Sequence, residues 1–203
     1  MSTTEPAGQR GPADHDVRGQ IVEAAEAHFS RYGYGKTTVA DLAKAIGFSK
    51  AYIYKFFDSK QAIGQAICVQ CLDKVLAAGE AGMADGKTAT EKLRRFFNGI
   101  IDTSAELFFE DKLLYDIAAY SAEERWPSAM AYVERAEALL REIILFGRET
   151  GEFERKTPID EVCEAILLVM QSFMNPLMLK HNLDDLPEAP TKVVNLVLRS
   201  LAP

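Results

Sequence analysis

The chain has few of the residues on which enzymes and metal proteins depend, with three histidines, three cysteines and one tryptophan among 203 residues. It contains no Gly-rich phosphate loop, no evident Ser-His-Asp arrangement and no cluster of residues spaced as metal ligands. These absences predict a protein that is not an enzyme, has no catalytic residues, and requires neither a metal nor another cofactor.

Cysteine is too scarce for a disulfide scaffold. The three cysteines are Cys68, Cys71 and Cys163, and this usage indicates the reducing cytoplasm. The Cys68-x-x-Cys71 spacing raises the possibility of a metal or redox site. However, the surrounding sequence is helical in pattern and no nearby histidine completes a ligand set. We therefore expect these thiols to be small buried residues of the core.

Long hydrophobic runs are also missing. The longest apolar run, AILLVM at 165–170, soon meets Gln171 and Ser172 and falls well short of the roughly 18–20 residues that a membrane span needs. Residues 1–15 are polar, rich in Gly and Pro, and lack the apolar segment of a signal peptide. We expect a cytoplasmic protein without membrane contact, beginning with a disordered tail over 1–15.

Positive charge is unevenly distributed along the chain. The whole chain has a net charge of −7, which argues against indiscriminate binding to nucleic acid. Residues 31–60 nevertheless contain six Lys or Arg against two Asp, which gives this segment a charge of +4. A basic segment on an acidic body indicates a directed contact with a polyanion.

Strand-like alternation is absent and helical periodicity is present almost everywhere, so the predicted fold class is all-α. GEAGMADGK at 79–87 holds three glycines and predicts a break between helices. We expect about nine helices, near residues 16–32, 39–46, 50–56, 59–78, 88–108, 110–122, 126–151, 158–181 and 191–201.

Residues 38–56 have the pattern of a helix-turn-helix: a helix of about eight residues, a turn, and a helix of about seven. Ala43 provides the small side chain that two crossing helices need, and Gly47 can adopt the positive φ of the turn. Thr38 and Ser49 are candidate N-caps for the two helices. Apolar residues of this segment can close a small core with the helix at 16–32.

At these positions the sequence resembles the TetR family of transcription regulators. The resemblance covers residues 21–63 and includes Thr37-Thr38-Val39, Leu42-Ala43, Gly47-Phe48-Ser49, Ile53-Tyr54 and Ser59-Lys60. It implies a helix-turn-helix DNA-binding domain over 16–64. For residues 65–203 the similarity is one of architecture alone, and it implies a helical ligand-binding and dimerisation domain.

The resemblance and side-chain chemistry together suggest the DNA contacts. Lys50, Ala51 and Tyr52 begin the recognition helix and are the predicted base readers, since Lys can donate to guanine and Ala can meet a thymine methyl. Tyr54 and Lys60 match residues of the family that hold the DNA backbone. The complete predicted set is Lys36, Thr38, Ala40, Ser49, Lys50, Ala51, Tyr52, Tyr54 and Lys60.

Several of these residues have a second interpretation. Ala40 stands where relatives often place a base-reading arginine, and no arginine occurs between residues 32 and 93. Tyr52 could instead cover the small core. Phe56 is expected to pack against the following helix or the DNA sugars rather than to read bases. His28, on the apolar face of the first helix, is expected to be a core histidine with a hydrogen-bond partner.

The carboxy-terminal helices predict a homodimer. Residues 159–179 are apolar on nearly every side, and such a helix must be covered on every side. The final helix, which contains VVNLVL, is also broadly apolar. In the family the last two helices of each subunit form the dimer interface, so we expect dimerisation through helices at about 158–181 and 191–201.

Rings and methionines in the helical body suggest an apolar pocket, although most of these residues must fill the core. Gln171 and Asn175 are polar groups in an otherwise apolar helix that could orient a ligand or bond within the dimer. The predicted lining residues for a small apolar or aromatic effector are Phe97, Ile101, Tyr115, Trp126, Met130, Met170 and Met174.

Together these patterns predict a ligand-responsive transcriptional regulator, most simply a repressor. It would bind a near-palindromic double-stranded DNA operator as a homodimer and be released by its effector. The alternative is a helical small-molecule sensor or an enzyme that does not bind DNA specifically.

Overall fold

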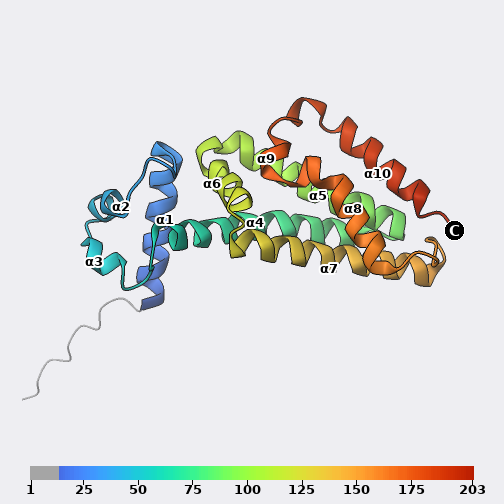
Figure 1. The fold of residues 1–203 in the computed structure, drawn as a ribbon, viewed down its shortest axis with the longest axis horizontal. Helices are drawn as coiled ribbons and strands as arrows, with labels where there is room; N and C mark the ends of the chain where they lie inside the picture. Colours follow the sequence, from blue (N-terminus) through green and yellow to red (C-terminus); the bar gives the residue numbers. More distant parts are fainter. Residues whose placement is uncertain (1–13) are drawn as a thin grey trace, which may run out of the picture.

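The computed structural model describes residues 14–203, so most of the expected tail at 1–15 lies outside the described residues. Ten α-helices and one 3-10 helix make up this part of the chain, which contains no strand, and the all-α class is confirmed (Figure 1). They are α1 (Asp14–Tyr32), α2 (Val39–Ile46), α3 (Lys50–Ile53), α4 (Lys60–Asp85), α5 (Ala89–Glu110), α6 (Lys112–Glu123), α7 (Pro127–Thr150), α8 (Ile159–Met174), α9 (Pro176–Leu179), η1 (Leu183–Asp185) and α10 (Glu188–Ser200).

Helices α1, α2 and α3 form a small head at one end of the molecule (Figure 1). Thr38 begins α2 with a capping box: its hydroxyl accepts from the Asp41 amide while the Asp41 carboxylate accepts from the Thr38 amide. Gly47 ends α2 at φ 78°, the left-handed conformation expected of this turn. The predicted helix-turn-helix is therefore present, although α3 is only four residues long and continues as a turn.

The core of the head is larger than the three helices themselves. Its buried centre combines Phe29, Leu42, Ile53 and Phe57, while Ile46 and Phe48 are only partly buried. It also takes in residues of α4 and α6 and the residue that precedes α7, namely Ile63, Ile67, Cys68, Ile117 and Trp126. The head is thus packed directly onto the body.

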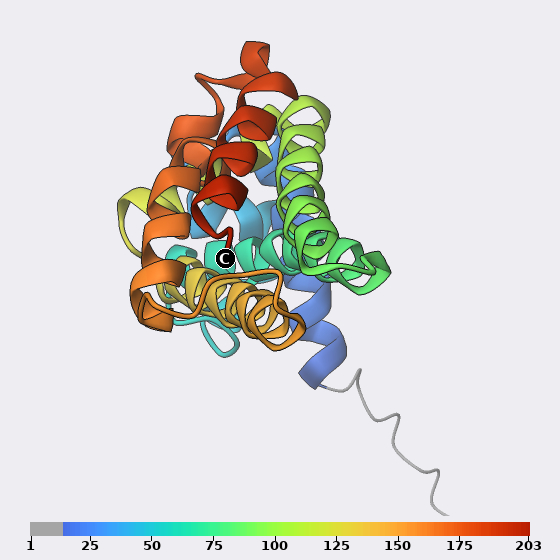
Figure 2. The same ribbon diagram turned by 90° about the vertical axis from the view of Figure 1, so that its right-hand side faces the viewer.

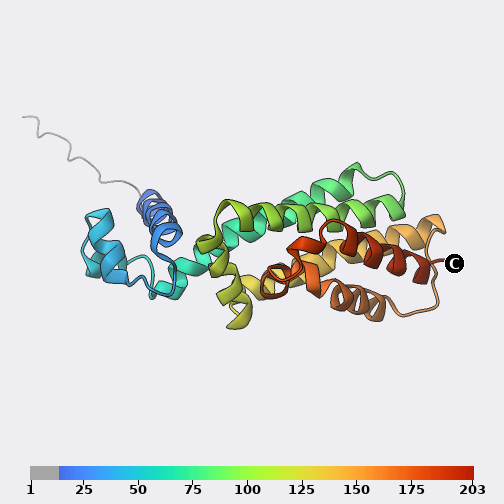
Figure 3. The ribbon, with the colours of Figure 1, turned by 90° about the horizontal axis from the view of Figure 1, so that it is seen from above.

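Helix α4 runs from the head to the far end of the body without a break (Figures 1 and 3). The predicted break occurs at the end of 79–87, where Gly86 follows Asp85, the last residue of α4. Gly79 and Gly82, which were expected to belong to the break, lie inside the helix. They allow α5 to approach closely: a Cβ at Gly82 would lie 2.5 Å from the carbonyl oxygen of Arg95, and one at Gly99 would lie 2.4 Å from that of Ala78. These glycines mark a contact between two helix backbones and not a helix end.

The body is a helical bundle in which α5 and α7 run along α4, while α8, α9 and α10 lie on the other side (Figures 1 and 2). A second core of buried side chains from α4, α5, α7, α8 and α10 fills it, including Phe96, Phe97, Leu140 and Met170. The chain ends at the extremity of the body opposite the head (Figure 1).

The helix expected over 158–181 is interrupted. Helix α8 ends at Met174, and Pro176 starts the short helix α9. Proline lacks an amide hydrogen and cannot continue the α8 hydrogen-bond pattern. Asn175 occupies the junction, where its side-chain oxygen accepts from the Leu177 amide at 2.9 Å.

Among residues 14–203, α4 is the one helix whose length and composition would suffice to cross a membrane. It packs along α5 and α7 and contributes Val75 and Leu76 to the core of the body. Its apolar character therefore has an explanation in the packing of the bundle.

Candidate nucleic-acid interface and internal cavity

Seven of the nine predicted DNA contacts are exposed on the surface of the head. Lys50 and Tyr54 belong to the recognition segment, where the Lys50 ammonium lies 5.7 Å from the centre of the Tyr54 ring. Tyr54 is 42% exposed. The exposed members of the predicted set are Lys36, Thr38, Ala40, Ser49, Lys50, Ala51 and Tyr54. These side chains are available to a large partner without any rearrangement of the head.

Tyr52 and Phe56 are half-buried in a row of three aromatic rings. Tyr52 makes edge contacts with Phe48 at 5.1 Å and with Phe56 at 5.3 Å between ring centres. The Lys55 ammonium lies 5.5 Å from the Tyr52 ring centre. Phe56 therefore packs against Tyr52, and Tyr52 both covers the small core and keeps part of its surface open to solvent.

Lys60 is held by the head itself. Its ammonium donates to the carbonyl oxygen of Tyr34 at 3.0 Å and lies 4.3 Å from the centre of the Tyr34 ring. Burial lowers the pKa of Lys60. One of its three N–H donors is occupied in this way, so the others remain able to meet a phosphate.

Tyr34 also connects the head to the body. Its ring lies 5.4 Å from that of Tyr120 in α6 and 5.6 Å from that of Trp126, which precedes α7. Gly64 of α4 makes room for this cluster, because a Cβ there would lie 2.9 Å from the Tyr34 ring and 3.1 Å from Trp126. Burial, with a contribution from Tyr120, raises the pKa of Tyr34 to about 12.

His28 has a partner in the head, as expected. Its Nδ1 lies 3.2 Å from the Thr37 hydroxyl, which donates to the Gly33 carbonyl oxygen. The imidazole is half-buried and its ring also contacts Tyr32. These contacts give His28 a structural role in joining α1 to the turn before α2.

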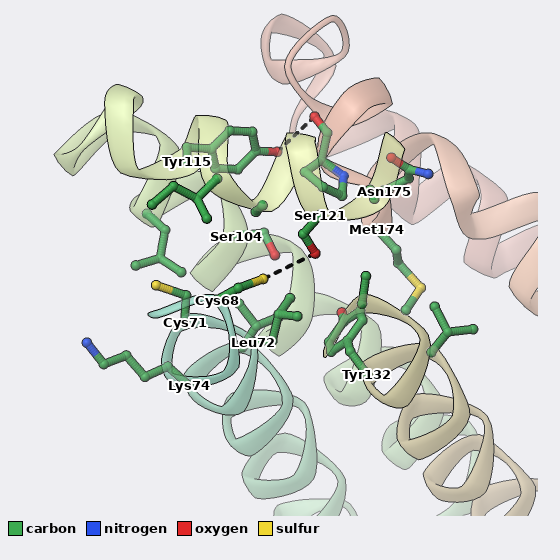
Figure 4. Close-up of a pocket in the computed structure, with 18 of the residues that line it drawn as sticks. Cys68, Cys71, Leu72, Lys74, Ser104, Tyr115, Ser121, Tyr132, Met174 and Asn175 are labelled. Carbon is green, nitrogen blue, oxygen red and sulfur yellow. Dashed lines mark hydrogen bonds between the residues drawn. The ribbon is translucent and has the colours of Figure 1, made fainter. Parts of the chain in front are cut away.

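A cavity of about 520 Å³ opens in the body between α4, α5, α6, α7 and α8 (Figure 4). Tyr115 donates its hydroxyl to the Pro176 carbonyl oxygen at 3.1 Å, which fixes one wall of the cavity to α9. Gln171 and Asn175 also line the cavity, and their side-chain amides lie 3.5 Å apart. The volume falls within the range of small-molecule sites.

Three of the seven predicted effector contacts line this cavity, namely Tyr115, Met130 and Met174. The other four do not: Phe97, Ile101 and Met170 lie in the core of the body, and Trp126 lies in the core of the head. Each of the four is at most 3% exposed. Large apolar side chains fill the spaces between helices, whereas small residues such as Ser104 and Ser121 leave the cavity open.

Cys68 and Cys71 also line the cavity, and Cys68 is at the same time a buried residue of the head core, as expected. Cys68 is buried and donates to the Ser121 hydroxyl at 3.3 Å. Cys71 is half-buried, and burial, followed by the nearby Glu26 carboxylate, raises its pKa to about 11. Burial also raises the pKa of Cys68. The raised pKa values favour the protonated thiols, which disfavours metal binding or redox reactivity.

Comparison with known proteins identifies the family. A model described as "Bacterial regulatory proteins, tetR family" matches residues 21–67, and a model described as "Tetracyclin repressor-like, C-terminal domain" matches residues 89–194. The chain belongs to the TetR family. This TetR-family protein is a DNA-binding transcriptional regulator, and regulators of the family bind operator DNA and act as dimers.

Individual relatives agree with this assignment. The uncharacterized HTH-type transcriptional regulator YfiR of Bacillus subtilis is 28% identical over 158 residues, which is 73% of each chain. TtgR, an HTH-type transcriptional regulator of Pseudomonas putida, is 40% identical over 52 residues, or 26% of this TetR-family chain and 25% of its own.

Solved structures are similar over most of the chain. The TetR-family regulator PfmR of Thermus thermophilus has 29% identity and a TM-score of 0.56, over 90% of this chain and 99% of its own. FadR of Bacillus subtilis, solved in complex with stearoyl-CoA, has 20% identity and a TM-score of 0.62, over 90% and 96%. At that identity the second comparison supports the fold alone.

Proposed function

We propose that this protein is a cytoplasmic, homodimeric repressor that binds a near-palindromic operator and is released when an apolar effector enters the cavity of the body. The observation that carries the proposal is the direct packing of the head, which presents the exposed recognition segment, onto a body with a 520 Å³ cavity. Helix α4 belongs to both parts, since Ile63 packs in the head and Val75 lines the cavity.

In this proposal the predicted DNA contacts divide into two groups. Lys50, Ala51 and Tyr52 would read base edges in the major groove, while Lys36, Thr38, Ser49, Tyr54 and Lys60 would position the head on phosphates. The domains would be a DNA-binding domain over 16–64 and a ligand-binding and dimerisation domain over 65–203. Because α4 crosses that boundary as one helix, a change in the body can reach the head.

Exposed apolar side chains support dimerisation through α8 and α10. Leu168 is 63% exposed, Val169 is 50% exposed, and Leu196 is 62% exposed, although these two helices pack against each other. A second copy of the chain would remove these side chains from water, which is the usual driving force for association.

The direct test is binding of the purified protein to the promoter region of its own gene, measured by fluorescence anisotropy over a range of salt concentrations. Specific binding should weaken steeply as salt rises, because lysine contacts release counterions from the DNA. Absence of binding, or equal binding to unrelated DNA, would favour the alternative of a small-molecule sensor that does not recognise DNA specifically.

Lys50 and Tyr54 should contribute differently to operator binding. Replacing Lys50 by alanine should weaken binding by about 10- to 100-fold and relax the base preference at one position of each half-site, because a base contact is lost. Tyr54→Phe should weaken binding to all sequences by a similar small factor, because a backbone contact carries no base information. Competition with single-base operator variants measures both effects.

Lys87→Ala provides the control, since Lys87 is also exposed but follows α4 at the end of the body away from the head (Figure 1). This variant should bind every operator variant as the unmodified protein does. An unchanged base preference in Lys50→Ala would show that Lys50 is not a base reader.

A further inference from the structure

The inner part of the cavity contains two hydroxyl groups that have no hydrogen-bond partner among the described residues. Ser104 of α5 and Tyr132 of α7 each line the cavity and are each 9% exposed. The other inner hydroxyls differ: Ser121 accepts from the Cys68 thiol, and Tyr115 donates to a carbonyl oxygen. Figure 4 shows Ser104, Ser121 and Tyr132 reaching the same region of the cavity from three helices.

These two hydroxyls keep surface open to the cavity. Neither of them is among the fully buried side-chain polar atoms of the described residues that lack a partner, which are Ser128 Oγ and Arg148 Nε, so water or a ligand in the cavity can bond them. Serine in a helix can satisfy itself by bonding the carbonyl one turn earlier, yet Ser104 makes no such bond. Both hydroxyls are therefore free to bond a molecule held inside.

Five charged residues line the cavity, and all of them are exposed or half-buried, whereas Ser104 and Tyr132 are buried; the five are Glu26, Lys74, Glu110, Asp111 and Arg125. Glu26, Lys74 and Asp111 lie close enough to Cys71 to influence its pKa. Burial raises the pKa of Tyr132, with a smaller contribution from Tyr115. The charged side chains thus belong to the more open part of the wall, and an ionic group placed beside Tyr132 would lose its hydration with little compensation.

We propose that the effector is an uncharged molecule, apolar over most of its surface, with a carbonyl or hydroxyl oxygen that hydrogen-bonds to both Ser104 and Tyr132. This proposal rests on the proposed function, in which the cavity receives the effector. Apolar neighbours such as Met130, Val133 and Met174 surround the rest of the molecule. Serine and tyrosine hydroxyls each donate and accept, so they suit either oxygen.

A matched series of ten-carbon probes tests the proposal in the full-length protein. Decan-2-one, decanoate and decylammonium share a chain and differ in the charge of the head group, and isothermal titration measures the Kd of each. We expect the Kd of decan-2-one to be at least about ten-fold lower than that of either ion. Tyr132→Phe and Ser104→Ala should each raise the Kd of the ketone about five-fold, the usual consequence of losing one hydrogen bond.

The control is Tyr32→Phe, which removes a tyrosine hydroxyl from α1 at a position outside the cavity wall and 49% exposed. It should leave the Kd of decan-2-one unchanged. Circular dichroism of each variant establishes that the fold is intact. Tighter binding of decanoate or decylammonium, binding of no probe, or an unchanged ketone Kd in Tyr132→Phe and Ser104→Ala would overturn the proposal.

Operator binding by the ligand-free protein, measured in parallel, distinguishes a wrong effector class from a wrong function. If the protein binds its operator but prefers an ionic probe, the effector class is wrong and the regulator function stands. If it binds no specific DNA, the proposed function fails whichever probe enters the cavity.

Discussion

Replacing Gly99 by alanine should lower the free energy of unfolding by about 2–3 kcal/mol, the scale of overpacking a close contact. The added Cβ would lie 2.4 Å from the Ala78 carbonyl oxygen and 3.0 Å from the Gly79 amide nitrogen. Both are backbone atoms of α4, so no side-chain rotation can relieve the clash and the two helices must separate. For a protein of this length the loss corresponds to a fall in Tm of very roughly 4–12 °C.

Gly19→Ala is the matched control. Gly19 also lies inside a helix, α1, but a Cβ there would meet nothing within 4 Å. Because alanine favours the helix more than glycine does, this variant should be stabilised by up to about 1 kcal/mol. Thermal unfolding at one protein concentration compares the two. Equal stability of Gly99→Ala and the unmodified protein would show that α4 and α5 are not in backbone contact.

The double substitution Leu168→Glu with Leu196→Glu should convert the dimer to a monomer and reduce operator affinity by more than about 100-fold. Two carboxylates on each chain would have to lose water at a contact that offers them no partner. A single head then loses the second half-site, which in the dimer is bound at high effective concentration. Sedimentation velocity reports the oligomeric state, and anisotropy reports the affinity.

Val69→Glu controls for the introduction of an acidic residue at an exposed apolar position. Val69 is 43% exposed on α4 and belongs to neither α8 nor α10. This variant should remain dimeric. If the double variant is also dimeric and binds the operator normally, the subunit interface lies on other helices.

The head was predictable in detail because its determinants are local. Thr38, Ser49 and Gly47 act within one or two turns of their own position, and their caps and the positive φ were expected from residue type alone. The tyrosine-rich recognition segment was harder to divide, since Tyr52 has one edge on the core and one in solvent. The neighbouring sequence does not determine how much of such a ring is buried and how much is exposed.

Two errors in the body have different causes. Gly79 and Gly82 looked like helix breakers because their purpose, the approach of α5, depends on residues far along the chain. The break at Asn175–Pro176 was visible in the sequence, since Pro176 cannot extend α8. The apolar pattern nevertheless continues beyond Pro176 to Leu179, so it predicts one helix where the proline separates two.

The cavity illustrates a limit of composition-based reasoning. Phe97 and Met170 were expected to line it because large rings and flexible thioethers are common in pockets, but these side chains are fully buried in the core. The signal that could have located the cavity was Ser104, a small polar residue on the apolar face of its helix. A small residue at a core position leaves space between the helices that a large residue would fill.

The close contact of α4 and α5 fixes α4 near one of its ends. Any tilt of the helix would turn about this contact, which would serve as a pivot. Gly82 and Gly99 hold the two backbones together near one end of a 26-residue helix, and Lys60 lies at the other end, about 33 Å from Gly82 along the axis. Cys71 and Val75, which line the cavity, lie between these two ends, so a molecule that fills the cavity would press on the helix there. A tilt of only about 5° around the pivot would carry Lys60 and the attached head through roughly 3 Å, a whole hydrogen-bond length.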